Sequence, residues 1–352
     1  MLSYRKLAMR VLGRPLHTEG IDSPRPASQR AAAFILTAAM LTTLAAPAFA
    51  DIWHIENGDI TISAGESGNN VTQNNNTTYG DTNTIITNQN KDTASSHTVT
   101  IEAKDKDDKV EVTLKDVNID TSSRNKAAVS VTGEGDTNIK LDGDNALKSD
   151  IYRSGIYGSG SLTISGGTVT ANGDDGGRGI SSSGSVTISG GSTVTANGGS
   201  GTISGGDGIW SGGGVTISGG STVTANGGNG GSLVGGDGIR SGGGLTVSDG
   251  TVTAKGGNGD SKDGYGGDGI RSGGVVTISG NTVNAAGGYG GKVGGYGICS
   301  FDRVAISGGT VEAAGGNGST GGGSGIYSSV IDLSGSLELT AKAGSPNGKA
   351  LS

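Results

Sequence analysis

The stretch GGDGIWSGGGVTISGGSTVTA, from Gly205 to Ala225, recurs in close copies between Gly155 and Ala313. The copies align on an Ile that follows a Gly and on the Ala that ends each TVTA-like segment. The distance from that Ile to that Ala is 15 or 16 residues in each copy, whereas the distance from the Ala to the next Ile varies from 9 to 16. A unit of fixed length therefore alternates with one variable loop, as in repeat proteins that stack into solenoids.

Apolar and small polar residues alternate within the unit. Val215 and Ile217 flank Thr216, and Val223 and Ala225 flank another Thr, which is the period of a β-strand. Three short runs per unit, GIWS, VTIS and TVTA, predict three strands of one coil in an all-β, single-stranded parallel β-helix. Stacking would bury two columns, Ile156, Ile180, Ile209, Ile239, Ile270, Ile298 and Ile326, and Leu162, Val186, Val215, Leu245, Val276 and Val304.

The first 50 residues have a different composition. They are basic up to Arg30, then apolar and Ala-rich, and they end in Ala48-Phe49-Ala50 before Asp51. This order predicts a secretory signal peptide at 1–50, with an uncleaved membrane anchor as the alternative. We therefore expect a secreted or cell-surface protein that has no transmembrane segment after cleavage.

The rest of the chain is expected to form three parts. Residues 51–154 carry strand-like runs without the regular repeat, and they predict divergent first coils and a cap. Residues 155–341 are the regular repeats, and 342–352 are expected to be a C-terminal tail. The pattern slips there, because Ile331 follows Ile326 by five residues rather than six.

Charge and cysteine content exclude some functions. Removal of residues 1–50, which hold six of the 25 basic and two of the 32 acidic residues, leaves a net charge near −11. A nucleic-acid partner is therefore not expected, because phosphate binding needs a basic surface. Cys299 is the only cysteine, so no intrachain disulfide forms, and we expect it on the surface or in a groove.

The segment TNIKLDGDNALKSD at 137–150, followed by SGIYGSGSLTISGGTVTA at 154–171, resembles the secreted bacterial carbohydrate-binding β-helix proteins of the cellulose- and pectin-binding type. The resemblance covers about residues 110–341. It implies a right-handed coil and a polysaccharide partner, either a cellulose- or pectin-like polymer or a glycan of a host or cell surface. The long GGNGG inserts depart from that pattern.

These Gly-rich inserts include 172–178, 226–234 and 255–267. All leave from the same corner of the coil, so we expect one fringe along the solenoid. Glycine adds backbone freedom, and the inserts are therefore expected to be flexible loops without a function of their own.

The position after each column Ile points outward by strand alternation. Aromatic rings there could stack on sugar faces, and guanidinium groups could pair with carboxylates or hydroxyls. The alternative is a row of unrelated surface residues. The candidate ligand-binding residues are Tyr157, Trp210, Arg240, Arg271 and Tyr327.

Asp207, Asp237 and Asp268 occupy the position two residues before the Ile. Three carboxylates stacked at strand spacing repel one another, so a neutralising partner is expected. Calcium is a candidate cofactor for these three residues. Arg240 and Arg271 could serve instead, and Asp before Gly is also a common turn residue.

Paired Thr columns, beginning with Thr168 and Thr170, lie on another face. Such pairs resemble ice-binding solenoids, although Thr is also a common outward strand residue. Our main hypothesis is a secreted, non-enzymatic protein that binds polysaccharide, with acidic polymers and calcium as one version. A structural or adhesive cell-surface protein is the alternative, and a polysaccharide lyase and an ice-binding protein are weaker hypotheses.

Overall fold

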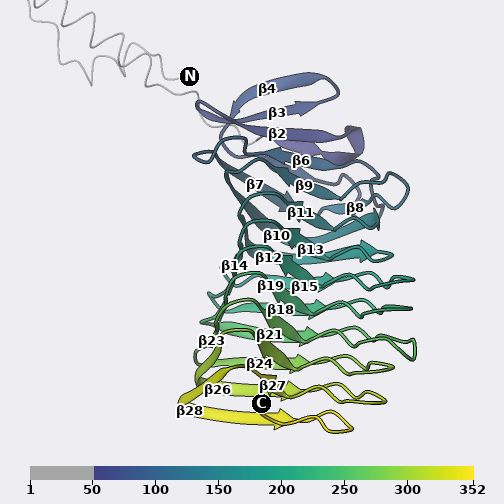
Figure 1. Ribbon diagram of the computed structural model, residues 1–352. Coiled ribbons are helices and arrows are strands. Elements are labelled where there is room, and N and C mark those ends of the chain that lie inside the picture. The colour runs from purple at the N-terminus through teal and green to yellow at the C-terminus, as the bar shows by residue number, and fades with distance from the viewer. Residues whose placement is uncertain (1–50) are drawn as a thin grey trace, which may run out of the picture. The chain divides into compact units, whose positions relative to one another are not determined.

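A computed structural model describes residues 51–352, and the predicted signal peptide at 1–50 lies outside this range. The described chain is a parallel β-solenoid of about nine turns (Figure 1), which confirms the predicted fold class. A single 3-10 turn, η1 (Ile55–Asn57), accompanies the strands. Within this range no helix is both long and apolar enough to cross a membrane.

Two sheets form the sides of the coil. Sheet 1 contains β1 (Ile52–His54), β5 (Ile85–Thr87), β7 (Lys109–Lys115), β8 (Asn118–Asp120), β10 (Asp136–Ile151), β12 (Leu162–Asp174), β14 (Val186–Ser189), β15 (Thr193–Asn197), β17 (Val215–Ile217), β18 (Ser221–Asn226), β20 (Leu245–Val247), β21 (Gly250–Lys255), β23 (Val276–Ile278), β24 (Asn281–Ala286), β26 (Arg303–Ala314) and β28 (Val330–Lys342). Sheet 2 contains β2 (Ile60–Gly65), β3 (Gly68–Gln73), β4 (Asn76–Asp81), β6 (Val99–Glu102), β9 (Val129–Thr132), β11 (Ile156–Gly158), β13 (Ile180–Ser182), β16 (Ile209–Ser211), β19 (Ile239–Ser241), β22 (Ile270–Ser272), β25 (Ile298–Ser300) and β27 (Ile326–Tyr327).

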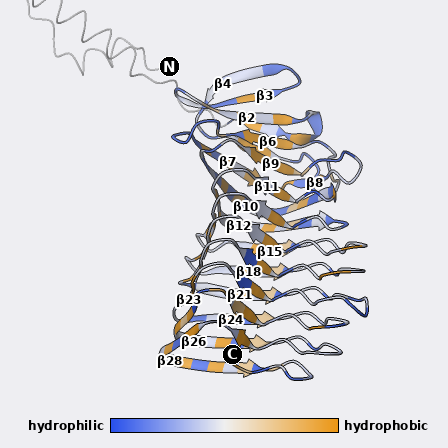
Figure 2. Ribbon diagram, viewed as in Figure 1, coloured by the Kyte–Doolittle hydropathy of each residue, from blue (hydrophilic) through white to orange (hydrophobic). Residues whose placement is uncertain are grey.

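Both predicted core columns are present. The column that starts at Ile156 pairs residue by residue along sheet 2 up to Ile326. The column that starts at Leu162 does the same along sheet 1 up to Val304. These side chains are buried, and Figure 2 shows hydrophobic positions repeating from coil to coil. Each fully buried Val or Ile contributes about 1.5–3 kcal/mol, so the stack of coils supplies the core that one coil lacks.

Sheet 1 bends at a Ser-Gly-Gly corner in the regular coils. Gly219 and Gly220 have φ angles of 63° and 72°, a region that side chains other than glycine rarely occupy. The Oγ atom of Ser221, which is fully buried, donates to the carbonyl oxygen of Ser218 at 2.8 Å. The sequence SGGS therefore turns the chain from a VTI strand into a TVTA strand.

The Gly-rich inserts are regular, which differs from the flexible loops that we expected. We call the segments 198–206, 227–236, 256–267, 287–295 and 315–323 the glycine loops. Parallel bridges join Gly201, Gly230, Gly259, Gly290 and Gly318 in successive loops. They form the row of long loops that extends to the right in Figure 1, so the expected single fringe is confirmed.

Backbone hydrogen bonds connect the two legs of each glycine loop and then the next loop. The Gly236 amide donates to Gly228 and the Gly257 amide donates to Gly236, each at 2.8 Å. A Cβ atom on Gly236 would lie 1.9 Å from the carbonyl oxygen of Gly206. Only glycine permits this approach, and the inserts are ordered because their backbones satisfy one another.

The two ends of the solenoid differ from the repeats. At the N-terminal end β3 pairs antiparallel with β2 and β4 pairs antiparallel with β3, in agreement with the expected cap. At the other end Ile331 pairs with Val304, so the shorter corner restores the register rather than ending it. The expected tail at 342–352 continues the coil, because Leu351 forms a bridge with Ile326.

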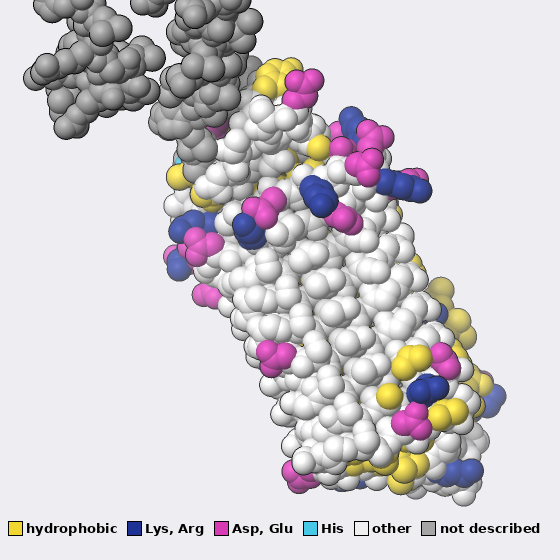
Figure 3. Space-filling model, turned by 90° about the vertical axis from the view of Figure 1, so that its left-hand side faces the viewer, with side chains coloured by type: hydrophobic (Ala, Val, Ile, Leu, Met, Phe, Trp, Pro, Cys, Tyr) yellow, Lys and Arg dark blue, Asp and Glu magenta, His cyan; other side chains and the backbone are white. Residues whose placement is uncertain are grey.

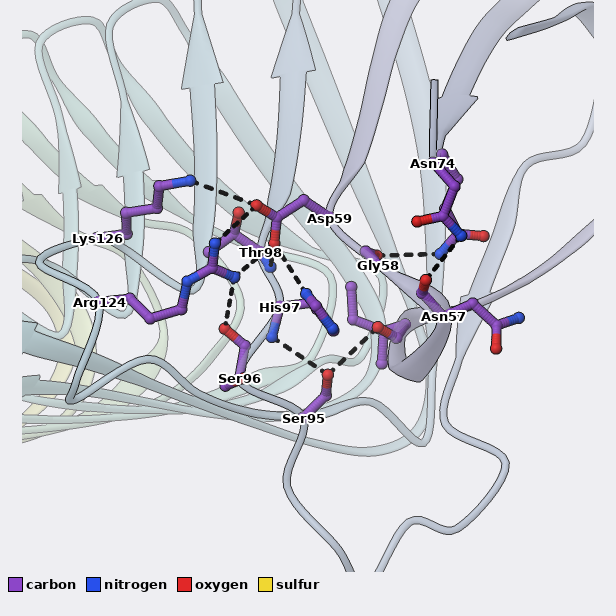
Figure 4. Close-up of polar contacts among 12 residues, drawn as sticks. Asn57, Gly58, Asp59, Asn74, Ser95, Ser96, His97, Thr98, Arg124 and Lys126 are labelled. Carbon is purple, nitrogen blue, oxygen red and sulfur yellow. Dashed lines mark hydrogen bonds and ion pairs between the residues drawn. The ribbon is translucent and has the colours of Figure 1, made fainter. Parts of the chain in front are cut away.

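An ion-pair cluster centred on Asp59 joins the first coils (Figure 4). Arg124 places its two Nη atoms 2.6 and 3.0 Å from the two carboxylate oxygens of Asp59. Lys126 and His97 lie 3.4 and 3.3 Å from the same carboxylate, and the Thr98 amide donates to it at 2.9 Å. Burial opposes ionisation, but these contacts together hold the pKa of Asp59 well below its usual range.

We expect Gly236→Ala to lower the free energy of unfolding by about 1–3 kcal/mol, because overpacking of this kind displaces backbone. Gly321→Ala is the matched control within a glycine loop, since its Cβ would meet only Val293 side-chain carbons at 3.8 Å. Urea denaturation followed by circular dichroism measures both. Equal stability of the two variants would contradict the close packing of the loops.

We expect Asp59→Asn to reduce the dependence of stability on acid. The folded-state pKa of Asp59 is lowered, so its contribution is complete at neutral pH and is lost as the pH falls below the ordinary aspartate range of about 4. Wild type should therefore lose more stability than the variant between about pH 5 and pH 2. Parallel acid dependence of the two melting temperatures would show that the cluster does not couple protonation to folding.

Candidate functional site

A groove of about 780 Å³ runs between sheet 2 and the glycine loops. We call it the arginine groove. One side is formed by sheet 2, with Arg240 on β19, Arg271 on β22 and Arg178 just before β13. The glycine loops form the other side, with Ile203 and Val234. Tyr265 and Val293 continue the loop side, since Val234, Tyr265 and Val293 are joined by parallel bridges. The groove therefore has one apolar side and one charged side, on which the three arginines lie beside Asp207, Asp237 and Asp268.

Strand register sets the spacing of the basic side. Arg240 and Arg271 are paired neighbours on β19 and β22, about 4.8 Å apart along the solenoid axis. Arg240 is exposed and Arg271 is partly buried. Both were predicted as ligand-binding residues, and the structure places both in the groove.

The other predicted ligand-binding residues continue the same column in register, because Trp210 pairs with Arg240, Tyr157 precedes Trp210 by two coils, and Tyr327 follows Arg271 by two coils. The Arg178 guanidinium lies 4.7 Å above the Trp210 ring, and Trp210 does not line the groove. Tyr157 lines a neighbouring cleft, and Tyr327 stacks on Tyr296 with ring centroids 4.8 Å apart. The predicted strip is therefore continuous in the strand register, but of its five candidate residues only Arg240 and Arg271 line the groove.

Side chains outside the repeat pattern were missed by the sequence argument. Arg178 replaces the column Asp in its coil, and that substitution was its only signal. Tyr265 and the aliphatic residues of the apolar side lie within the Gly-rich inserts, whose register became visible only in the folded chain. Tyr296, which also lines the groove, occupies the Asp position of a later coil.

The three column aspartates form a buried ladder at the groove. The Asp237 amide donates to Oδ1 of Asp207 at 2.9 Å, and the Asp268 amide donates to Oδ1 of Asp237 at 2.7 Å. The ladder ends where the Tyr296 amide donates to Oδ1 of Asp268 at 2.7 Å. Each carboxylate therefore accepts a hydrogen bond from a backbone amide of the next coil. The aspartates thus connect the coils, in addition to the turn-forming role that we considered for Asp before Gly.

Arginine provides the neutralising charge. Nε of Arg178 lies 3.2 Å from Oδ2 of Asp207, and Nη1 of Arg271 lies 3.3 Å from Oδ2 of Asp268. Burial raises the pKa of Asp268 to about 6, although Arg271 opposes this. Burial also raises the pKa of Asp237, and the charges of Asp268 and Asp207 add to the effect.

These contacts test whether the aspartates fit calcium. Calcium takes roughly six to eight oxygen ligands, whereas every Oδ1 of the ladder accepts a backbone amide and two of the three Oδ2 atoms face arginines. Within residues 51–352, no group of three or more His, Cys, Asp or Glu residues could hold a metal ion. Asp207, Asp237 and Asp268 therefore do not fit the calcium site that we considered.

Cys299 and the Thr columns complete the predicted positions. Cys299 pairs with Arg271 and Tyr327 on the neighbouring strands. It is buried rather than exposed, and burial raises its pKa to about 12. Thr168 and Thr170 head two columns that pair in register through β15, β18 and β21. Asn284 and Glu312 continue the second column, so the Thr pairs end there.

Comparison of the chain with models of protein families, with curated proteins and with solved structures finds no match.

We expect Asp237→Asn to stabilise the protein at pH 8. The amide oxygen of Asn can still accept from the Asp268 amide, and Asp237 forms no ion pair among the described residues. A raised folded-state pKa means that the native state binds the proton more tightly, so wild-type stability falls as the pH rises through the shifted range. The variant should lose this fall and differ little from wild type near pH 4. Urea denaturation at both pH values measures the effect, and a variant less stable than wild type at pH 8 would contradict it.

Proposed function

We propose that this chain is a non-enzymatic protein that binds a linear acidic polysaccharide in the arginine groove. The observation that carries the proposal is the pairing of a row of arginines with an apolar side along one groove, where the aspartates between them are buried. Guanidinium groups form charge-assisted, bidentate contacts with carboxylates. Aliphatic and aromatic side chains suit the C–H faces of sugar rings, because they bury apolar area without requiring a hydrogen-bond partner.

The distribution of charge supports an anionic ligand. The described chain is acidic, with a net charge near −11 for 51–352, so the arginines of the groove are not part of a generally basic surface, and the aspartates beside them are buried. Figure 3 shows another face whose middle coils are almost free of charged side chains. Basic groups gathered in one groove can raise the local concentration of an anionic polymer and orient it.

Arg240 is the most informative groove residue. It is exposed and forms no ion pair among the described residues, so its guanidinium is available to a ligand. Arg178 and Arg271 already contact carboxylates, and their removal would leave a buried charge unpaired. An effect of Arg240 on binding can therefore be separated from an effect on folding.

We expect wild type to be retained on insoluble pectate, with retention that falls as salt is added. Arg240→Ala should weaken binding about 10- to 100-fold, the usual effect of losing a hydrogen bond to a charged group. Lys255→Ala is the matched control, since it removes an exposed positive charge from β21 on sheet 1. Binding isotherms on pectate, with insoluble cellulose in parallel, measure the differences.

The outcomes discriminate among the hypotheses. Absence of retention on both polymers would remove the polysaccharide proposal and favour a structural or adhesive role. Equal losses for Arg240→Ala and Lys255→Ala would show that overall charge, rather than the groove, governs retention. A chelator arm tests dependence on calcium, and unsaturated uronate absorbance on polygalacturonate tests for lyase activity.

A further inference from the structure

A second cleft lies beside the arginine groove on the same side of the solenoid. It has a volume of about 520 Å³, and Lys126, Arg153 and Tyr157 are among its lining residues. Tyr152 and Arg178 line both this cleft and the arginine groove. We call it the upstream cleft. The two hollows are therefore adjoining parts of one surface rather than separate sites.

Both hollows carry basic side chains. Arg153 is exposed and forms no ion pair among the described residues, and its Nε donates to Oδ1 of Asn125 at 3.0 Å. Arg240 is the equivalent uncompensated group in the arginine groove. An anionic chain that entered one hollow would find in the other a guanidinium that forms no ion pair within residues 51–352.

Tyr152 occupies the junction. It is 68% exposed although it is a large aromatic residue, and its φ angle of 58° is unusual for a bulky side chain. Its ring lies against Gly176, where an added Cβ would be 3.2 Å from two ring carbons. The backbone therefore holds an exposed ring in a strained conformation between two basic hollows, and strain of this kind often marks a functional position.

The geometry points to a single extended site in which one acidic polysaccharide chain crosses Tyr152 and contacts both hollows. This inference rests on the proposed function. Strand pairing places the coils of Arg153 and Arg271 four steps apart, about 19 Å along the axis. That length accommodates roughly four sugar rings, with the Tyr152 ring as the stacking platform beside Arg153, where the two hollows meet.

A length series of oligogalacturonides tests the extended site by calorimetry. A long oligomer should bind wild type at one chain per protein and at least about tenfold more tightly than a trimer, because the second contact becomes intramolecular. Tyr152→Asn removes the ring but suits the left-handed backbone, so it should fold normally and bind the long oligomer about 2- to 10-fold more weakly. Tyr152→Phe keeps the ring and should bind like wild type, as should Tyr79→Ala, which removes an exposed ring on β4.

Arg153→Gln provides an independent arm. It should weaken binding of the long oligomer. It should leave unchanged the binding of the trimer in the arginine groove, which Arg240→Ala abolishes. Equal affinity for both lengths, or two independent long chains per protein, would overturn the extended site while leaving the proposed function in place. No binding of either length to wild type would instead overturn the proposed function itself.

Discussion

The close approach of glycine backbones between successive loops is the constraint on which the functional side of this solenoid depends. Gly236 and Gly257 belong to a continuous series of hydrogen bonds that alternates between the two legs of the glycine loops. Contacts near 2 Å from a hypothetical Cβ to a neighbouring carbonyl leave no room for side chains at these positions. The loops are therefore fixed in the same register as the strands. This register carries Val234 and Tyr265 alongside the arginines of sheet 2, and without it the groove would lose one side.

The aspartate ladder shows how a solenoid tolerates stacked like charges. Each carboxylate accepts the amide of the next coil, and Arg178 and Arg271 approach the two ends of the ladder. Hydrogen bonds from amides favour the charged carboxylates, whereas burial and mutual repulsion oppose ionisation. Asp237, in the middle, has no ion-pair partner among the described residues, and burial together with the charges of Asp268 and Asp207 raises its pKa. Such a ladder connects coils, and it also leaves Arg240 free to face the groove.

The repeat made the fold predictable, because a column position has the same environment in every coil. The buried Ile and Val columns followed directly from spacing, and so did the outward direction of Arg240 and Arg271. Order in the glycine loops did not follow, since Gly-rich sequence is equally typical of flexible linkers and only the register of neighbouring loops distinguishes the two. The environment of Trp210 was unpredictable for a similar reason. Its ring is covered by Arg178 from the preceding coil, and a contact between different columns has no signature in the repeat.

The departures from the repeat, rather than the repeat itself, give this surface its chemistry. A solenoid of identical coils would present the same residue at every step and would bind any polymer with equal strength along its length. Here Arg178 precedes the aspartate column and pairs with its first member, and Tyr296 ends the column. Tyr152 is an exposed aromatic residue just before the regular coils begin, and its backbone conformation costs free energy. These substitutions line one side of the molecule, where the two hollows adjoin. The core columns run on through the same coils unchanged, so the scaffold is uniform where the surface is not, and binding can be specified locally without altering the packing that supports it.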